Sequence, residues 1–573
     1  MIVGMQHLDL VCLASEKDAT LAELRELGAV HLDLGAAAGA DVAAAKGTAA
    51  AAEAAVRAIR KARKELGLSR PLAKSVPRTP ADVLALVAKR IEQQAEAERL
   101  ARLIRQYAPY GDFDPALARK ILDAGVDLSG VAELPEKLPP KRLSALEADR
   151  AALLKKIADG NAALAATDEE AILKSCPALA DRIAFEEARE LMATHGALAC
   201  ISGWVPAPAC EKVRAAAAAK GWGILLRPVA PGETPPTLID PPRFFKSMKA
   251  LFGGLGIVPA YTESDVSVPF MCYFSLFFAM LVGDGAYGAI FLAATLWGWK
   301  KTAGRRTPVA RSWLVLLTVF SSATIVWGLL SNTWFGAQLP WCRDWPTVKW
   351  LGDVTYRHMM LLCFTIGVSH LMLARIWNGV CKLNDTTCLA EFGWAGILLF
   401  MYFVTNAIVG VFPGIPTAMY AVFGVSLVCV FGFTLKPSEF KTRGAELGML
   451  PLSVMSTLGD IISYVRLFAV GLASVKVAEN FNAMAMGLFA GSHAWWASAL
   501  AGLGAAFILV VGHGLNLAMA GLSILVHAVR LNTLEFSNHK GVTWSGYAFA
   551  PFRRRAAGVS NIPFQTVKEN TNE

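Results

Sequence analysis

The sequence predicts a mainly α-helical protein, in which cytoplasmic α/β lobes joined by an antiparallel coiled coil precede a polytopic membrane domain of eight helices. The first 243 of its 573 residues are rich in Ala, Glu, Lys and Arg and hold no apolar run long enough to cross a bilayer. From about residue 268 to 531, apolar stretches of roughly 18 residues or more follow one another, each able to span a hydrocarbon core about 30 Å thick. We therefore expect a cytoplasmic domain at 1–243, a membrane domain at 244–537 and a cytoplasmic C-terminal tail at 538–573.

The front domain is predicted to carry two short β-α-β units. Each has the order strand, helix, strand, at residues 2–12, 17–27 and 29–34 in the first unit and 197–205, 209–220 and 221–229 in the second. Both combine short apolar runs with a helical segment. The opening residues show no basic leader followed by a long apolar core, so we expect this domain to stay in the cytoplasm.

Two long polar helices between these units predict an antiparallel coiled coil. Apolar residues of the second helix follow a 3-4 spacing, at Leu143, Leu146, Leu153, Ile157 and Leu164. The first helix covers 81–107, and the proline-bearing stretch 109–140 joins the two and returns the chain to its start. The Ala-rich segment 36–56 fits either a helix or a linker. No GxxxxGK(S/T) loop occurs, so we expect a structural spacer that neither binds nor hydrolyses ATP.

The length and charge of the apolar stretches predict the membrane topology. Candidate spans lie at 268–298, 312–331, 357–378, 390–411, 416–434, 446 to about 490 and 497 to about 534. The first is too long for one helix and is interrupted by GDGAYG at 283–288, so we expect a tight hairpin and eight crossings in total. The basic residues beside the spans then share the cytoplasmic side: Lys300, Lys301, Arg305, Arg306, Arg311, Lys436, Lys441, Arg443 and Arg553 to Arg555. The Trp-rich segment 334–350 falls on the outer face.

Two arginines lie deep inside apolar spans, Arg466 in LGDIISYVRLFAVGLAS and Arg530 in GLSILVHAVRLNTLEF. A guanidinium in the bilayer core costs on the order of several kcal/mol and cannot shed its proton, so it is kept only for a buried partner or an ion path. Function is therefore expected where the two arginines face each other. Asp460 and Glu535 lie near the expected ends of the same helices, where capping or snorkelling also explains them.

Other polar groups in the spans have structural explanations. Asp284 at the hairpin tip is expected to cap backbone N–H groups, and a role in an ion path is the less favoured alternative. His370, His513 and His527 are expected to form interhelical hydrogen bonds. Ser463 belongs to a stripe of small residues around Arg466, which suits close packing or a surface that slides past other helices.

Bulk composition excludes several classes of function. The net charge of +9 arises largely from soluble helices and from short loops beside spans, so no nucleic-acid partner is needed. The ten cysteines show no CxxC pair and no Cys/His cluster at zinc spacing, so neither a disulfide framework nor a metal site is indicated. We expect no cofactor.

Stretches along nearly the whole chain resemble the membrane subunit of rotary V-type and A-type ATPases, called subunit a in eukaryotes and subunit I in bacteria and archaea. The resemblance begins at MIVGMQHLDLVCLASEKDATLAELRELGAVHLDL and continues at SGWVPAPACEKV in 202–213. The hairpin sequence is GDGAYG where the family usually has GDxGYG or GDxGHG. The most specific matches are GDIISYVRLFAVGLA at 459–473 and HAVRLNTLEF at 527–536, which resemble the seventh and eighth membrane helices of that family.

The resemblance implies a stator. Arg466 and Arg530 would face the lipid-embedded carboxylate of a rotating ring of small membrane subunits, while two offset aqueous half-channels load and unload H⁺ or Na⁺. The half-channel residues of eukaryotic members do not carry over here. The candidates for the ion path are therefore Asp460, Ser463 and Glu535.

The implied partners are the rotor ring, peripheral stalk subunits bound by the cytoplasmic domain, the central stalk cap, the ATP-hydrolysing head and the lipid bilayer. The implied location is a bacterial plasma membrane, with both termini in the cytoplasm. Two other classes remain open. A secondary transporter would show internal repeats and a second broken helix, and a coiled-coil membrane sensor would not need two intramembrane arginines.

Overall fold

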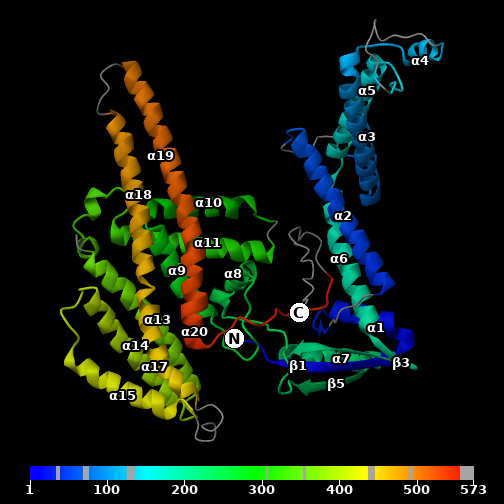
Figure 1. Ribbon diagram of the computed structural model, residues 1–573. Coiled ribbons are helices and arrows are strands. Elements are labelled where there is room, and N and C mark those ends of the chain that lie inside the picture. The colour runs from blue at the N-terminus through cyan, green and yellow to red at the C-terminus, as the bar shows by residue number, and fades with distance from the viewer. Residues whose placement is uncertain are drawn as a thin grey trace. The chain divides into compact units, whose positions relative to one another are not determined.

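The computed structural model describes residues 1–33, 39–68, 76–124, 135, 137–304, 307–352, 356–435, 445–489 and 495–554, which are mostly helical (Figure 1). The chain forms two compact units. The N-terminal unit comprises Met5–Val229 with Ala550–Glu573, and the membrane unit comprises Met1–Gly4 with Ala230–Phe549. Several predicted features lie outside the described residues: Arg305, Arg306, Lys436, Lys441, Arg443, Arg555, positions 36–38 and 125–134, and most of the predicted tail, at 555–573.

One sheet organises the N-terminal unit. Its central strand β1 (Met5–Leu13) pairs antiparallel with β4 (Leu198–Pro206) on one side and with β5 (Gly223–Pro228) on the other. The short strands β2 (His31–Leu32) and β3 (Ala193–His195) both pair with β4. The predicted arrangement as two separate α/β lobes is therefore wrong, because strands from both predicted β-α-β units alternate in this sheet.

The strands of the two predicted β-α-β units share one sheet for a simple physical reason. A lone pair of strands cannot bury enough apolar surface and leaves both edges open. In the shared sheet, Leu8 and Leu10 of β1 are fully buried together with Leu21 of helix α1 (Lys17–Leu27) and Val213 of helix α7 (Cys210–Lys220). The predicted helices at 17–27 and 209–220 are confirmed within one residue at each end.

Long helices make up the rest of the N-terminal unit: α2 (Ala40–Glu65), α3 (Pro80–Tyr107), α4 (Pro115–Asp123), α5 (Leu143–Ala165) and α6 (Glu169–Leu191). Helix α3 packs on α5, and α2 packs on α6 (Figure 1). Arg78, just before α3, donates to the Ala163 carbonyl near the end of α5, whereas Asp114 beyond α3 pairs with Arg142 at the start of α5. Helices α3 and α5 are therefore antiparallel. Their description as a coiled coil stays a prediction.

The start of α3 illustrates how the local sequence fixes a helix end. Thr79 accepts a hydrogen bond from the Asp82 backbone N–H, and the Asp82 side chain accepts one from the Thr79 backbone N–H. This capping box satisfies two of the free N–H groups of the first turn, and Pro80 occupies the first helical position, where no N–H is needed. The Ala-rich segment, left open between helix and linker, is helical from Ala40 onward.

The membrane unit contains five described helical stretches long and apolar enough to cross a bilayer: Pro308–Ser331 (α11), Arg357–Cys381 (α13), Cys388–Ile408 (α14), Leu447–Leu488 and Ser498–Lys540. The last two join α17 (Ala445–Ile462) to α18 (Val465–Phe489), and α19 (Trp495–Ser523) to the segments that follow it. Helix α15 (Thr417–Phe433) is apolar but shorter. These helices agree with a multi-pass membrane protein, and the count of eight crossings stays a prediction.

The GDGAYG sequence breaks the first apolar stretch, as predicted. Helix α9 (Ser267–Val282) ends at Gly283, whose φ of 70° favours glycine, and α10 (Gly285–Lys301) follows at an angle of 119°. The buried Asp284 carboxylate accepts hydrogen bonds from the backbone N–H groups of Ala286 and Gly336, each at 2.8 Å. The predicted capping role of Asp284 is confirmed.

Helix α9 lies at the centre of the membrane unit, packed against α11, α18 and α19. Phe270 and Phe277 of this helix are fully buried, as are Phe364 of α13 and Tyr464, which precedes α18. Such a core holds the neighbouring helices in one register because bulky interdigitating side chains leave few alternative packings. It therefore fixes the position of the residues just beyond Tyr464.

Candidate functional site

The first candidate residue, Arg466, lies in the first turn of α18, directly after a short turn at residues 463–464. The Ser463 hydroxyl donates to the Asp460 backbone carbonyl at 2.7 Å, so this side chain is engaged locally. Tyr464 donates to or accepts from the Nδ1 of His370 at 2.9 Å, as expected for an interhelical histidine. Arg466 is thus carried by a helix start that is anchored to α13.

The second candidate, Arg530, lies between two π-helical segments, Ile524–Ala528 (η6) and Leu531–Phe536 (η7), which continue α19. Segments with this wide turn are rare and occur often at functional sites. Two side chains satisfy backbone carbonyls here, because Asn532 donates to Ala528 at 2.9 Å and Ser537 donates to Asn532 at 2.8 Å. These bonds stabilise a wide turn on either side of the arginine.

Arg466 and Arg530 converge on one carboxylate. The Arg466 Nη1 lies 3.8 Å from the Glu535 Oε1, and the Arg530 Nε lies 3.5 Å from the same oxygen. The Glu535 side chain is 6% exposed, that of Arg466 is 21% exposed and that of Arg530 is 54% exposed. Within the described residues, neither the Arg466 Nη1 nor the Glu535 Oε2 has a hydrogen-bond partner. Glu535 attracts both arginines, and the group still has hydrogen-bonding capacity for another partner.

Asp460 does not join this trio and belongs to a second charged group. Its Oδ2 lies 3.0 Å from the His539 Nε2, and the His539 Nδ1 accepts a hydrogen bond from the Arg375 Nε at 3.1 Å. Arg375 and Lys382 both pair with Glu391, at 3.1 Å and 2.6 Å. Because Arg375 donates to Nδ1, the neutral His539 ring must carry its proton on Nε2 and donate it to Asp460.

His539, Arg375 and Glu391 were not identified from the sequence. A signal was present for Arg375, which lies inside an apolar span and is as costly there as Arg466. Glu391 lies in the first turn of α14, where an acidic residue attracts little notice because it suits the helix dipole. No sequence signal pointed to His539, because its two partners, Asp460 and Arg375, are distant in the chain and meet it only in the fold.

A further polar network joins α10, α18 and α19. The His513 Nδ1 lies 2.6 Å from the Tyr287 hydroxyl, and its Nε2 lies 3.1 Å from the Asn482 Oδ1, so the predicted interhelical bonding of His513 is confirmed. Asn516 donates to the Tyr287 hydroxyl and to the Ser474 carbonyl. The Nδ1 of the third predicted histidine, His527, is buried without a partner among the described residues.

A cavity of about 320 Å³ opens beside α18 on the C-terminal side of Arg466. Its lining runs along α18 from Leu467 to Glu479 and includes Gly283, Thr333 and Lys476. Asp460 lies on the opposite side of Arg466 along the chain. In the described part of the chain, no group of three or more His, Cys, Asp or Glu side chains could hold a metal ion.

Comparison with known proteins gives a consistent picture, although no family model matches the sequence. The chain is 33% identical over 372 residues to V-type ATP synthase subunit I of Borreliella burgdorferi, an alignment that covers 62% of this chain and 60% of that relative. It is 27% identical to V-type ATP synthase subunit I 1 of Treponema pallidum, over 97% of this chain and 100% of the relative. A-type ATP synthase subunit I of Methanocaldococcus jannaschii is 25% identical over 74% of this chain and 65% of the relative.

Proposed function

We propose, from the premise that this chain is a homologue of subunit I of V-type and A-type ATP synthases, that it is the stator of a rotary ATPase and provides the path for the translocated ion. The observation that carries this proposal is the convergence of Arg466 and Arg530 on the buried Glu535. Two fixed cations with a single shared anion leave a net positive charge inside a membrane unit, which a static structural role does not require.

The two arginines supply a charge to which a rotor carboxylate can respond. A carboxylate on a passing ring of small membrane subunits would meet Arg530 first, because its side chain is the more exposed of the two. The guanidinium favours the ionised form of that carboxylate, so the ring site releases its ion there. The same positive charge repels cations and thereby opposes a direct leak between the two sides of the membrane.

Two offset half-channels can be assigned to features on either side of Arg466. We assign one to the cavity that extends from Leu467 to Glu479, and the other to the chain from Asp460 through His539 to Arg375. A histidine with one nitrogen bonded to a carboxylate and the other to an arginine is a suitable group to pass protons at the end of such a path. Ser463 is left as a helix-stabilising residue, because it bonds to the backbone.

The remaining assignments follow from the proposed role. The N-terminal unit, on the cytoplasmic side of a plasma membrane, would hold the membrane unit against peripheral stalks, the central stalk cap and the ATP-hydrolysing head. Its paired long helices suit a rigid element under torque. This chain itself would carry no nucleotide hydrolysis.

The deciding experiment measures ATP-driven ion uptake in vesicles that carry the assembled complex. Arg466→Ala should abolish uptake while the ring and head subunits still co-purify in wild-type proportion. Arg311→Ala is the matched control, because this arginine is exposed at the start of α11 and belongs to neither charged group. Uptake that survives in Arg466→Ala at matched assembly would show that the arginine is structural and would refute the proposed ion path.

A further inference from the structure

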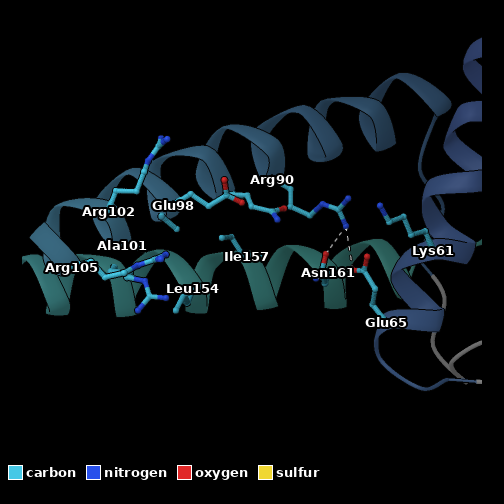
Figure 2. Close-up of a pocket in the computed structure, with 13 residues that line it drawn as sticks. Lys61, Glu65, Arg90, Glu98, Ala101, Arg102, Arg105, Leu154, Ile157 and Asn161 are labelled. Atoms are coloured by element: carbon cyan, nitrogen blue, oxygen red, sulfur yellow. Dashed lines mark hydrogen bonds and ion pairs between the residues drawn. The ribbon is translucent and has the colours of Figure 1, made fainter.

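A cavity of about 740 Å³ lies in the N-terminal unit between the antiparallel helices α3 and α5, with the end of α2 beside it (Figure 2). Its apolar floor consists of small or medium side chains, among them Ala97, Ala101, Leu154 and Ile157. Small residues on α3 leave room between two helices that otherwise pack closely. The volume falls within the range of about 300–1,000 Å³ that is typical of ligand sites.

Positive charge dominates the lining of this cavity. Five basic side chains contribute, from Lys61, Arg90, Arg102, Arg105 and Arg150, against the two acidic side chains of Glu65 and Glu98. At one end, Arg90 lies 2.9 Å from the Asn161 Oδ1 and 3.6 Å from the Glu65 carboxylate. Figure 2 shows this pairing, with Arg102 and Arg105 at the opposite end. The excess charge therefore gathers at the end away from Glu65.

Among the described residues, the arginines at the end of the cavity away from Glu65 lack the ion pairs that most neighbouring arginines form. Nearby on the same unit, Arg60 and Arg63 pair with Glu169, and Arg99 pairs with Glu96. By contrast, Arg102, Arg105 and Arg150 form no ion pair with any residue that the structure describes. Arg102 and Arg105 are three residues apart on one helix face, where like charges repel. A cluster of this kind is stabilised when an anion binds to it.

We propose that this cavity binds an oligophosphate. A guanidinium offers a planar fork of N–H donors that matches phosphate oxygens two at a time, and arginines rather than lysines predominate here. Several basic side chains at one end of an open cavity suit a compact anion with many negative charges better than an extended acidic peptide, which would also have to pass Glu65 and Glu98. The site is separate from the ion path and does not depend on it.

The proposal can be tested on the full-length chain purified in detergent. Inorganic tripolyphosphate is titrated by calorimetry at 150 mM salt, and hydrogen exchange of α3 and α5 locates the bound anion. We expect saturable binding that protects residues near Arg105, and about tenfold weaker binding for each arginine removed in the Arg105→Ala/Arg150→Ala variant. The Arg99→Ala variant is the matched control and should bind like wild type, because Arg99 lies on the same helix but does not line the cavity.

Two further arms identify the source of the phosphates and exclude other occupants. ATP that binds no better than tripolyphosphate would support a site for the phosphate chain alone, whereas markedly tighter ATP binding would support a nucleotide. Arg105→Lys/Arg150→Lys keeps the charge but loses the forked geometry, so its affinity should lie between wild type and the alanine variant. The proposal is overturned if tripolyphosphate shows no saturable binding, if the double alanine variant binds as wild type does, or if a short poly-glutamate peptide binds more tightly than tripolyphosphate.

Discussion

Arg530 and Glu535 are five residues apart along one helix, yet the Arg530 Nε lies 3.5 Å from the Glu535 Oε1. On a regular α-helix, five residues turn the chain by about 140° beyond a full turn, which would point the two side chains to different faces. The π-helical segment Leu531–Phe536 has a wider turn, with i→i+5 hydrogen bonds, and so brings residues five apart much closer to one face. The wide turn is therefore what allows Arg530 to share a carboxylate with Arg466.

Replacement of Glu535 by Gln should weaken both the fold and the ion path. The substitution removes the one anion that Arg466 and Arg530 share, so two neighbouring guanidiniums repel each other without compensation. We expect a loss of about 1–3 kcal/mol in unfolding free energy, because the buried Arg466 Nη1 loses its counter-charge, together with at least about tenfold slower ion uptake. Denaturant unfolding in detergent and vesicle uptake measure the two effects. Wild-type behaviour in both assays would contradict this account.

Asp284 offers a test that separates capping from ion transfer. Asp284→Asn removes the charge but keeps one acceptor oxygen, which can still cap the Ala286 N–H and gives up only the bond from Gly336, so uptake should stay near wild type. Asp284→Ala removes the acceptor and should destabilise the membrane unit by about 1–2 kcal/mol, the usual effect of losing a helix N-cap. Thermal unfolding and vesicle uptake distinguish the cases. If Asp284→Asn folds normally but stops uptake, the carboxylate carries ions and the capping explanation is insufficient.

Sequence reasoning succeeded where a strong local signal existed. The periodic helices at 81–107 and 143–164 and the break at GDGAYG are set by residues next to one another in the chain. The cost of a guanidinium inside an apolar span singled out Arg466 and Arg530 as candidates, and their role in an ion path stays a prediction.

Features that depend on distant parts of the chain could not be predicted in this way. The single sheet requires residues near 5 and near 205 to meet, and each half alone has the pattern of a complete unit. The π-helical turns were not predicted, because the local bonds of Asn532 and Ser537 that support them and the stacking of Phe536 on His370, with ring centroids 4.4 Å apart, become visible only in the folded chain. The pairing of Asp460 with His539 likewise joins residues that are far apart in the sequence, so no local pattern predicts it.

Glu391 should be a major contributor to the stability of the membrane unit. Its nearly buried carboxylate holds both Arg375 and Lys382. Removal of one partner from a buried ion pair typically costs about 3–5 kcal/mol, so we expect Glu391→Gln to lower the unfolding free energy by roughly 3 kcal/mol. Glu479→Gln is the control, because Glu479 pairs with Lys476 at an exposed position, where the expected loss is below about 1 kcal/mol. Equal losses in the two variants would show that the Glu391 group is solvated.

The N-terminal unit should lose stability in mild acid through His31. Burial lowers the pKa of this imidazole below its ordinary value near 6.5, and its Nδ1 accepts a hydrogen bond from the Ala550 backbone N–H at 3.0 Å. The unfolded chain therefore binds a proton at His31 more readily than the folded unit does. The stability linked to His31 is fully present above about pH 6.5 and is lost as the pH falls through the lower folded-state pKa.

Hydrogen exchange of the full-length chain between pH 7.5 and 5.5, corrected for the intrinsic pH dependence of exchange, measures this effect at β2 and β4. We expect protection of these strands to fall with pH in the wild type. In His31→Asn the pH dependence should be reduced, because the amide oxygen can still accept from Ala550 and does not titrate in this range. Peptides of α3 serve as an internal control, since this helix is remote in sequence from His31. Unchanged protection of β2 and β4 across this range would show that His31 binds its proton equally well in the folded and unfolded chain.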